Sequence, residues 1–272
     1  MRLNPNMFSL NIYKNYKNKL ADNSKAIGNI SSGIKLNKAK DNPNKISQSE
    51  SLKIQILSSA AVKRNIEDTN SMIQTFDSAM GEMNDSLLRM KELTTQAASG
   101  TLTTSDRDAI QLEIDGLNKH IDYMANNTEF NGIKLINENG AITSTVGIMQ
   151  GESTSIPKYD LTSTALGIKG MDITDPSNIN SAMTSVDNAI NQVLGARGDY
   201  GALQLRFESS GENMDENSIS LQKAQSNIAD ADIAEEMIKF SQSQILIQSS
   251  IALMAQSNNF PQDALKVLQN IK

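Results

Sequence analysis

The chain has 272 residues, 38% of them hydrophobic but only 4% aromatic, and it contains no tryptophan and no cysteine. It therefore forms no disulfide and no thiolate metal site, and so few aromatic side chains do not predict a wide globular core. Thirteen methionines and many aliphatic residues fit thin seams between helices better. The net charge of -6 argues against a nucleic-acid-binding protein.

The charge is unevenly distributed along the chain. Residues 1–64 contain twelve Lys or Arg and three Asp or Glu, a balance of +9, and the remainder contains thirteen and twenty-eight, a balance of -15. A basic arm can bind nucleic acid or an anionic membrane. Here the acidic remainder of the same chain could contact the basic arm, so we favour protein–protein contacts. No run of eighteen apolar residues and no signal-peptide segment occurs, so membrane insertion is not expected.

The first predicted helix covers about residues 5–36. It ends near residues 41–44, because Pro43 disfavours helical backbone at Asn42. Its apolar residues are spaced by three or by seven, which places them on one side of the helix. They are Leu10, Tyr13, Leu20, Ile27 and Ile34.

The strongest pattern follows over residues 62–97, where apolar residues alternate in steps of four and three. This period of 3.5 residues, kept over five heptads, predicts a coiled-coil-like helix about 54 Å long. The seam consists of Val62, Ile66, Thr69, Ile73, Phe76, Met80, Met83, Leu87, Met90, Thr94 and Ala97.

A third helix with the same period begins with Thr104 or Ser105 as its N-cap and ends near residues 126–127. Residues 133–176 contain short apolar stretches among Gly, Ser, Thr and Pro, which predicts a small β-rich insert. The seam of the third helix is Ile110, Ile114, Leu117, Ile121 and Met124.

A second long helix follows Pro176 and keeps the heptad phase, and the stripe of a final helix begins at Ile233 in a different phase. The fold class is therefore mainly α, with long coiled-coil-like helices and a small β-rich insert. The long-helix seam is Ile179, Met183, Val186, Ile190, Val193, Tyr200, Phe207, Met214, Leu221 and Ile228. The final stripe is Ile233, Met237, Phe240, Ile247, Ile251, Met254, Leu265 and Leu268.

Catalytic chemistry is poorly supported by the sequence. His120 is the only histidine and lies about 90° from the seam of its helix, which is typical of a solvated position. The zinc-protease motif needs two histidines, and the carboxylates at 230–236 are explained by a helix start. We therefore predict no catalytic residue, no metal site and no cofactor, and a protein that is not an enzyme.

Six short blocks give a specific resemblance to bacterial flagellin, and together they cover both ends of the chain in order. They are residues 3–4, 30–37 (ISSGIKLN), 89–100 (RMKELTTQAASG), 128–132 (TEFNG), 230–237 (DADIAEEM) and 254–258 (MAQSN). The resemblance implies a structural subunit that is exported unfolded by the flagellar type III apparatus and self-assembles into the extracellular flagellar filament.

The resemblance also implies a domain arrangement. Residues 1–43 and 233–272 would pair as an inner-tube domain, and residues 44–232 would form a rod-like helical bundle that includes the 133–176 insert. The partners implied are other copies of the chain, the flagellar export chaperone, the filament cap and the hook-junction proteins. Inner-tube assembly would use Leu10, Tyr13, Leu20, Ile27, Ile34, Ile233, Met237, Phe240, Ile247, Ile251 and Met254.

Two further sites follow from the resemblance. Arg89, Leu93 and Gln96 point away from the seam of the long helix, and with Glu113 they would form contacts between subunits and with the vertebrate Toll-like receptor for flagellin. The serine and threonine residues of the insert are typical of a solvated loop, and the resemblance adds the alternative that they carry O-glycans on the outer surface, with Thr143, Ser144, Thr145, Ser153, Thr154 and Ser155 as candidates.

Three alternatives to a filament subunit were weighed. A hook-filament junction protein of the flagellin superfamily shares the end blocks but need not polymerise. A binding module would dock its basic amphipathic arm on an anionic membrane, which the acidic remainder disfavours. An enzyme is the weakest alternative because no nucleophile, base or metal ligands occur in a recognisable arrangement.

Overall fold

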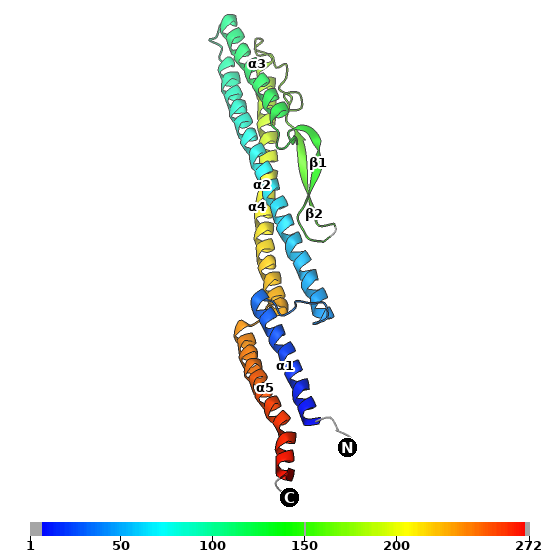
Figure 1. The fold of residues 1–272 in the computed structure, drawn as a ribbon. Helices are drawn as coiled ribbons and strands as arrows, with labels where there is room; N and C mark the ends of the chain where they lie inside the picture. The colour runs from blue at the N-terminus through cyan, green and yellow to red at the C-terminus, as the bar shows by residue number, and fades with distance from the viewer. Residues whose placement is uncertain (1–6, 150, 270–272) are drawn as a thin grey trace. The chain divides into compact units, whose positions relative to one another are not determined.

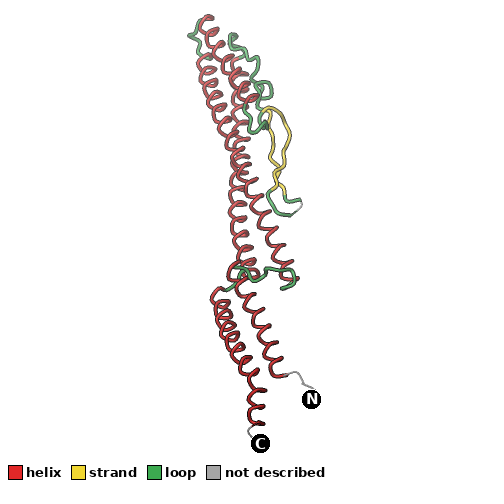
Figure 2. The backbone as a smooth tube through the Cα atoms, viewed as in Figure 1, coloured by secondary structure: helices red, strands yellow, loops and turns green. Residues whose placement is uncertain are grey.

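The computed structural model describes residues 7–149 and 151–269. The chain divides into two compact units, residues 1–54 with 220–272 and residues 55–219. The described residues form five helices and one two-stranded antiparallel sheet, which confirms the predicted mainly α class (Figures 1 and 2). The two longest helices are α2 (Pro43–Ala97) and α4 (Ile179–Ala229).

In the first unit, α1 (Met7–Ser32) lies alongside α5 (Ile233–Gln269) (Figure 1). The segments that follow α1 and precede α5 are joined by an isolated antiparallel bridge between Ile34 and Asp230. The backbone N–H of Lys35 donates to the carbonyl of Ala229 at 2.8 Å. The predicted breaks are confirmed, since α2 begins at Pro43 and α5 begins directly after Asp232.

In the second unit, α2 and α4 run antiparallel and share a core. Three ion pairs set their register: Lys63 with Asp215 at 2.7 Å, Asp77 with Arg197 at 2.8 Å and Lys91 with Asp187 at 2.7 Å. All eleven seam positions predicted on α2 are buried, as are Ile179, Val186, Val193, Tyr200 and Phe207 on α4. The predicted seam of α2 is therefore confirmed in full, whereas the other five positions predicted on α4 are only partly buried: Met183, Ile190, Met214, Leu221 and Ile228.

A second row of buried residues on α2 was not predicted. Met72, Ala79, Ser86 and Leu93 are spaced by seven residues and lie beside the predicted seam. The helix α3 (Thr104–Asn127) returns alongside the end of α2 (Figure 1), and its Ile110, Ile114 and Ile121 belong to the same core cluster. Because a third helix covers a second face of α2, the buried stripe is wider than a two-helix seam.

The N-cap of α3 is Thr103, not Thr104 or Ser105 as predicted. The Thr103 hydroxyl accepts from the backbone N–H of Asp106, and the Asp106 carboxylate accepts from the backbone N–H of Thr103. This reciprocal capping box satisfies two backbone donors at the helix start, which a cap one residue later would not do. The hydrogen bonds from Thr103 also lower the pKa of Asp106.

The predicted small β-rich insert is confirmed as a hairpin of β1 (Asn137–Thr145) and β2 (Ser153–Asp160). In the register, Ile142 pairs with Ile156, and the side chain of Ile156 is fully buried. The loop after β2 is anchored to the helices, because the side-chain amide of Asn118 donates to the carbonyl of Ile168 at 3.3 Å. The insert therefore forms part of the same core as the helices.

Two tyrosines connect the hairpin to α4. The buried Tyr200 hydroxyl donates to the carbonyl of Pro157 at 2.9 Å, and the Tyr159 hydroxyl donates to the carboxylate of Asp199. Their rings lie 5.7 Å apart between centroids. Burial, the hydrogen bond and the negative charge of Asp199 raise the pKa of Tyr159 from 10.0 to about 12. Burial likewise raises the pKa of Tyr200.

These raised pKa values predict a loss of stability in base. A raised pKa gives stability that is present below the unfolded value near pH 10 and is lost as the pH rises toward about 12. We expect the wild type to lose about 1 kcal/mol more of its free energy of unfolding than Tyr159→Phe between pH 9 and pH 11.5, after allowing for solvent screening. Denaturant unfolding at both pH values measures this, and equal losses in the two proteins would contradict the assignment.

Candidate assembly interface

The helices α1 and α5 face each other through a heptad seam of polar, small and apolar residues. Residues of reduced exposure alternate in steps of three and four along both helices. On α1 they are Ser9, Ile12, Tyr16, Lys19, Asn23, Ala26 and Ile30, with the buried Asn29 beside Ile30, and on α5 they are Glu236, Phe240, Ser243, Ile247, Ser250, Met254 and Ser257. Polar contacts cross this seam, including a bond of 3.4 Å from the Asn23 side-chain amide to the carbonyl of Phe240.

The apolar stripe predicted on α1 lies outside this seam and is exposed. The side chains of Leu10, Tyr13, Leu20, Ile27 and Ile34 retain between 39% and 58% of their accessible surface. The buried residues of α1 are Ile12, Ala26 and Asn29, and only Ile12 has a large apolar side chain. Because these side chains are already about half covered, burying the rest of the stripe would contribute about 0.7–1.5 kcal/mol per side chain, so the stripe is a candidate for contacts with another molecule.

The predicted stripe on α5 is divided between the seam and the surface. Phe240, Ile247 and Met254, spaced by seven residues, are partly buried in the seam, whereas Ile233, Met237 and Ile251 are exposed. The side chains of Leu265 and Leu268 lie outside the described residues. Sequence reasoning missed further exposed apolar residues that do not fall on the stripe: Met7, Phe8, Ile238, Ile245, Leu246 and Leu253.

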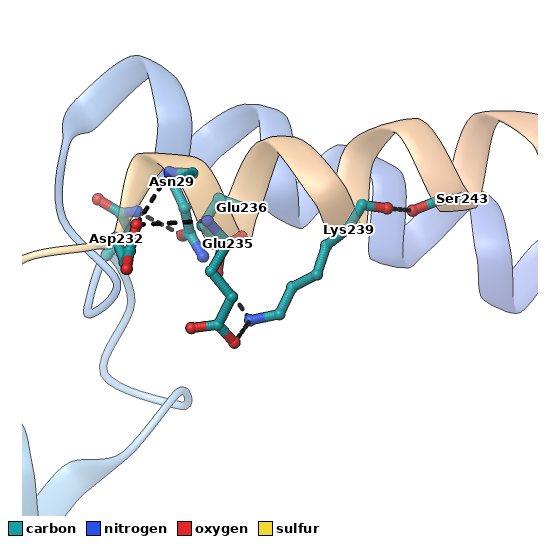
Figure 3. Close-up of polar contacts among 8 residues, drawn as sticks. Asn29, Asp232, Glu235, Glu236, Lys239 and Ser243 are labelled. Carbon is teal, nitrogen blue, oxygen red and sulfur yellow. Dashed lines mark hydrogen bonds and ion pairs between the residues drawn. The ribbon is translucent and has the colours of Figure 1, made fainter.

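The start of α5 is fixed by polar contacts within the same unit (Figure 3). The Asp232 carboxylate caps the helix by accepting from the backbone N–H groups of Ala234 at 2.9 Å and Glu235 at 3.3 Å. One turn later Lys239 pairs with Glu235 at 2.9 Å and Glu236 at 3.1 Å, and these bonds raise the pKa of Lys239. Asp232, Glu235 and Glu236 are thus accounted for by helix capping and pairing, and Asp230 accepts from the Ser226 hydroxyl at 2.6 Å.

A second candidate surface lies on α2 and α3. The Arg89 guanidinium pairs with the carboxylates of Glu113 at 2.9 Å and Glu92 at 3.1 Å, and these hydrogen bonds raise the pKa of Arg89. Arg89, Glu113 and Gln96 are exposed, so three of the four residues predicted here reach the surface. The structure brings Arg89 and Glu113 into direct contact.

Leu93 was expected to point away from the core and is instead buried, with 2% of its surface exposed. It belongs to the row of α2 residues covered in the region of α3, so it is not available at the surface of the monomer. The apolar residues beside the Arg89–Glu113 pair in the sequence are Leu88 and Leu112, which are 45% and 73% exposed. Sequence reasoning missed both leucines because neither falls on a predicted seam.

The six glycosylation candidates occur as three cross-strand pairs at the turn end of the hairpin: Thr143 with Ser155, Ser144 with Thr154 and Thr145 with Ser153. Opposed residues share a face of a sheet. The Ser144 hydroxyl lies 2.7 Å from the Thr69 hydroxyl of α2, so the middle pair is on the partly buried face. The other four side chains are exposed.

His120 is exposed, and no group of three His, Asp or Glu side chains is close enough to hold a metal ion within the described ranges. None of the helices in the described part of the chain has an apolar stretch of the length needed to span a bilayer. The most distinctive surfaces of the described residues are therefore the exposed apolar faces of the long helices.

The fold and these faces define a helical protein with long coiled-coil-like helices, and the comparisons with known proteins agree. The model of the bacterial flagellin N-terminal helical region matches residues 3–141, and that of the bacterial flagellin C-terminal helical region matches residues 183–268. The chain belongs to the bacterial flagellin family.

Individual relatives extend over nearly the whole chain. A flagellin of Halalkalibacterium halodurans is 34% identical, covering 99% of this chain and 100% of the relative. The flagellar filament 30.7 kDa core protein of Treponema maltophilum is 32% identical, covering 98% and 100%. Among solved structures, a Bacillus cereus flagellin is 28% identical with a TM-score of 0.51, covering 56% of this chain and 88% of that one.

Proposed function

We propose that this protein is a structural subunit that self-assembles into the bacterial flagellar filament and has no enzymatic activity. The observation that carries this proposal is the position of the terminal apolar stripes. Within one chain, α1 and α5 pair through a mixed seam of polar, small and apolar residues and leave Leu10, Leu20, Ile27 and Ile251 exposed. Apolar faces of this size gain free energy when other copies cover them.

In the filament, residues 1–43 and 233–272 form the inner tube and residues 44–232 form the surrounding helical domain. The subunit is exported unfolded through the flagellar type III apparatus and acts outside the cell. Its partners are other copies of the chain, an export chaperone, the filament cap and the hook-junction proteins. Family membership and the matched end blocks support these roles.

The surface around Arg89, Gln96 and Glu113 serves contacts between neighbouring subunits and is the site at which a vertebrate Toll-like receptor for flagellin would bind. Its support is the exposed Arg89–Glu113 ion pair with Leu88 and Leu112 beside it in the sequence. O-glycans are best accommodated at Thr143, Thr145, Ser153 and Ser155, which are exposed on the hairpin.

Seeded polymerisation tests the proposed function. Purified monomer is mixed with short sonicated filaments of the same protein, and elongation is followed by light scattering and electron microscopy. We expect filaments to lengthen until the free monomer falls to a critical concentration, because each added copy covers apolar stripes. A protein that caps the seeds without lengthening them would instead be a junction protein, and the filament proposal would be wrong.

A further inference from the structure

The helix α4 has an exposed apolar row in the second unit that the chain itself does not cover. Leu194, Leu205 and Ile219 are 47%, 69% and 50% exposed. Spacings of eleven and fourteen residues place them within about 40° of one another around the helix. Between them on the same side lie Gly198, Gly201, Glu208 and Glu212.

This side of α4 carries features that do not stabilise the monomer. Glycine is among the least favourable residues in a helix interior, yet a Cβ at Gly198 or Gly201 would meet no atom within 4 Å. Glu208, Glu212 and Glu216 repeat at four-residue spacing, where like charges repel. All three are exposed, and none forms an ion pair within the described part of the chain.

The side of α2 that faces away from its seam offers a complementary surface in the same unit. Leu57 is 63% exposed, and Arg64 is exposed without an ion-pair partner in the residues that the structure describes. Further along the same side, the hydroxyls of Ser71, Thr75 and Ser78 all donate to carbonyls of their own helix at 2.9 Å. This part of the surface is therefore small and already satisfied in its hydrogen bonds.

We propose that this side of α4 is a docking surface for the exposed side of α2 in a second copy of the chain. The spacings match when the two helices run antiparallel, as α2 and α4 do within one chain. Leu57 and Arg64 are seven residues apart, as are Ile219 and Glu212, about 10.5 Å along each helix. Leu57 then meets Ile219, and Arg64 meets Glu212 with Glu208 one turn away.

The same alignment places Thr75 opposite Gly201 and Ser78 opposite Gly198, so two small surfaces allow the helix backbones to approach closely. It also places Leu205 opposite Ser71 and Leu194 opposite the exposed Glu82, so the apolar contact is centred on Leu57 and Ile219. One like-charge pair, Asp68 and Glu208, falls in this alignment with Arg64 one turn from it. The surfaces on α2 and α4 differ, so each copy uses one to bind the next copy. Such heterologous contacts extend into rings or open polymers, and the inference therefore rests on the proposed filament function.

Removing the glycines tests the docking surface without weakening the fold. We expect Gly198→Ala with Gly201→Ala to leave the midpoint of monomer unfolding unchanged or higher, because alanine favours helix. The critical concentration for seeded elongation should rise at least tenfold, because two methyl groups separate the backbones. Elongation equal to that of the wild type would overturn the proposal.

A charge exchange tests the identity of the partner surface. Arg64→Glu and Glu212→Arg should each raise the critical concentration several-fold, and the two changes in one chain should restore it to within twofold of wild type. Glu129→Arg, an exposed position outside both helices, is the matched control and should have no effect. If the double variant elongates no better than the single variants, α2 is not the partner surface and the proposal fails.

The outcomes separate this inference from the function on which it rests. If the wild type does not elongate seeds at all, the filament function fails. If the wild type and every variant elongate alike, the filament function stands and the α4 docking surface is wrong.

Discussion

Replacing Leu20 and Ile27 together by aspartate is expected to abolish filament growth while the monomer keeps its helical domain. Both side chains are about half exposed on α1, outside the seam with α5. Covering the exposed half of these two side chains contributes about 1.5–3 kcal/mol per copy, and burying an aspartate in place of each costs further free energy. The critical concentration should therefore rise at least about a hundredfold. Seeded elongation followed by sedimentation measures the effect, and the denaturant midpoint of residues 55–219 reports on the fold.

The matched control adds the same two charges to polar positions of the same helix. Asn15 and Asn18 are exposed on α1, and Asn15→Asp with Asn18→Asp should change the critical concentration far less. The comparison separates loss of apolar contact from simple charge repulsion between copies. Normal filaments from the Leu20/Ile27 variant would show that this stripe is not an assembly surface.

Leu93→Ala is expected to destabilise the monomer by about 2–5 kcal/mol, because it removes a buried side chain from a packed core. Its effect on assembly would then follow from loss of the fold and not from loss of a subunit contact. Denaturant unfolding monitored by circular dichroism measures the free energy of unfolding directly. A variant as stable as the wild type would contradict the burial of Leu93 in the region of α3.

Leu88 provides the comparison for this prediction. It lies on the same helix at 45% exposure, so Leu88→Ala should change the free energy of unfolding by less than about 1 kcal/mol. If the Arg89 surface contacts neighbouring subunits, Leu88→Asp should raise the critical concentration for elongation at nearly unchanged monomer stability. An aspartate at Leu93 cannot make this distinction, because a buried charge would itself disrupt the core.

The sequence alone determined the order of the elements and one buried line along each long helix. A heptad pattern held from Val62 to Ala97 is strong because every third or fourth side chain must lie on one line, and all its positions are buried. The break at Pro43 followed from local backbone chemistry, and the break near Asp232 followed from the change of phase of the apolar stripe. The stripe on α1 was also visible, because spacing by three and seven needs no knowledge of a partner.

Only the tertiary structure decided which faces are covered, because coverage depends on helices distant in the sequence. The packing of α3 beside α2 moved Leu93 into the core and left Leu88 at the surface. On α1 the residues that pack toward α5 include Asn23 and Ala26, although apolar spacing pointed to Leu20 and Ile27. Periodicity locates a face on its helix, whereas the arrangement of the other helices determines what that face contacts.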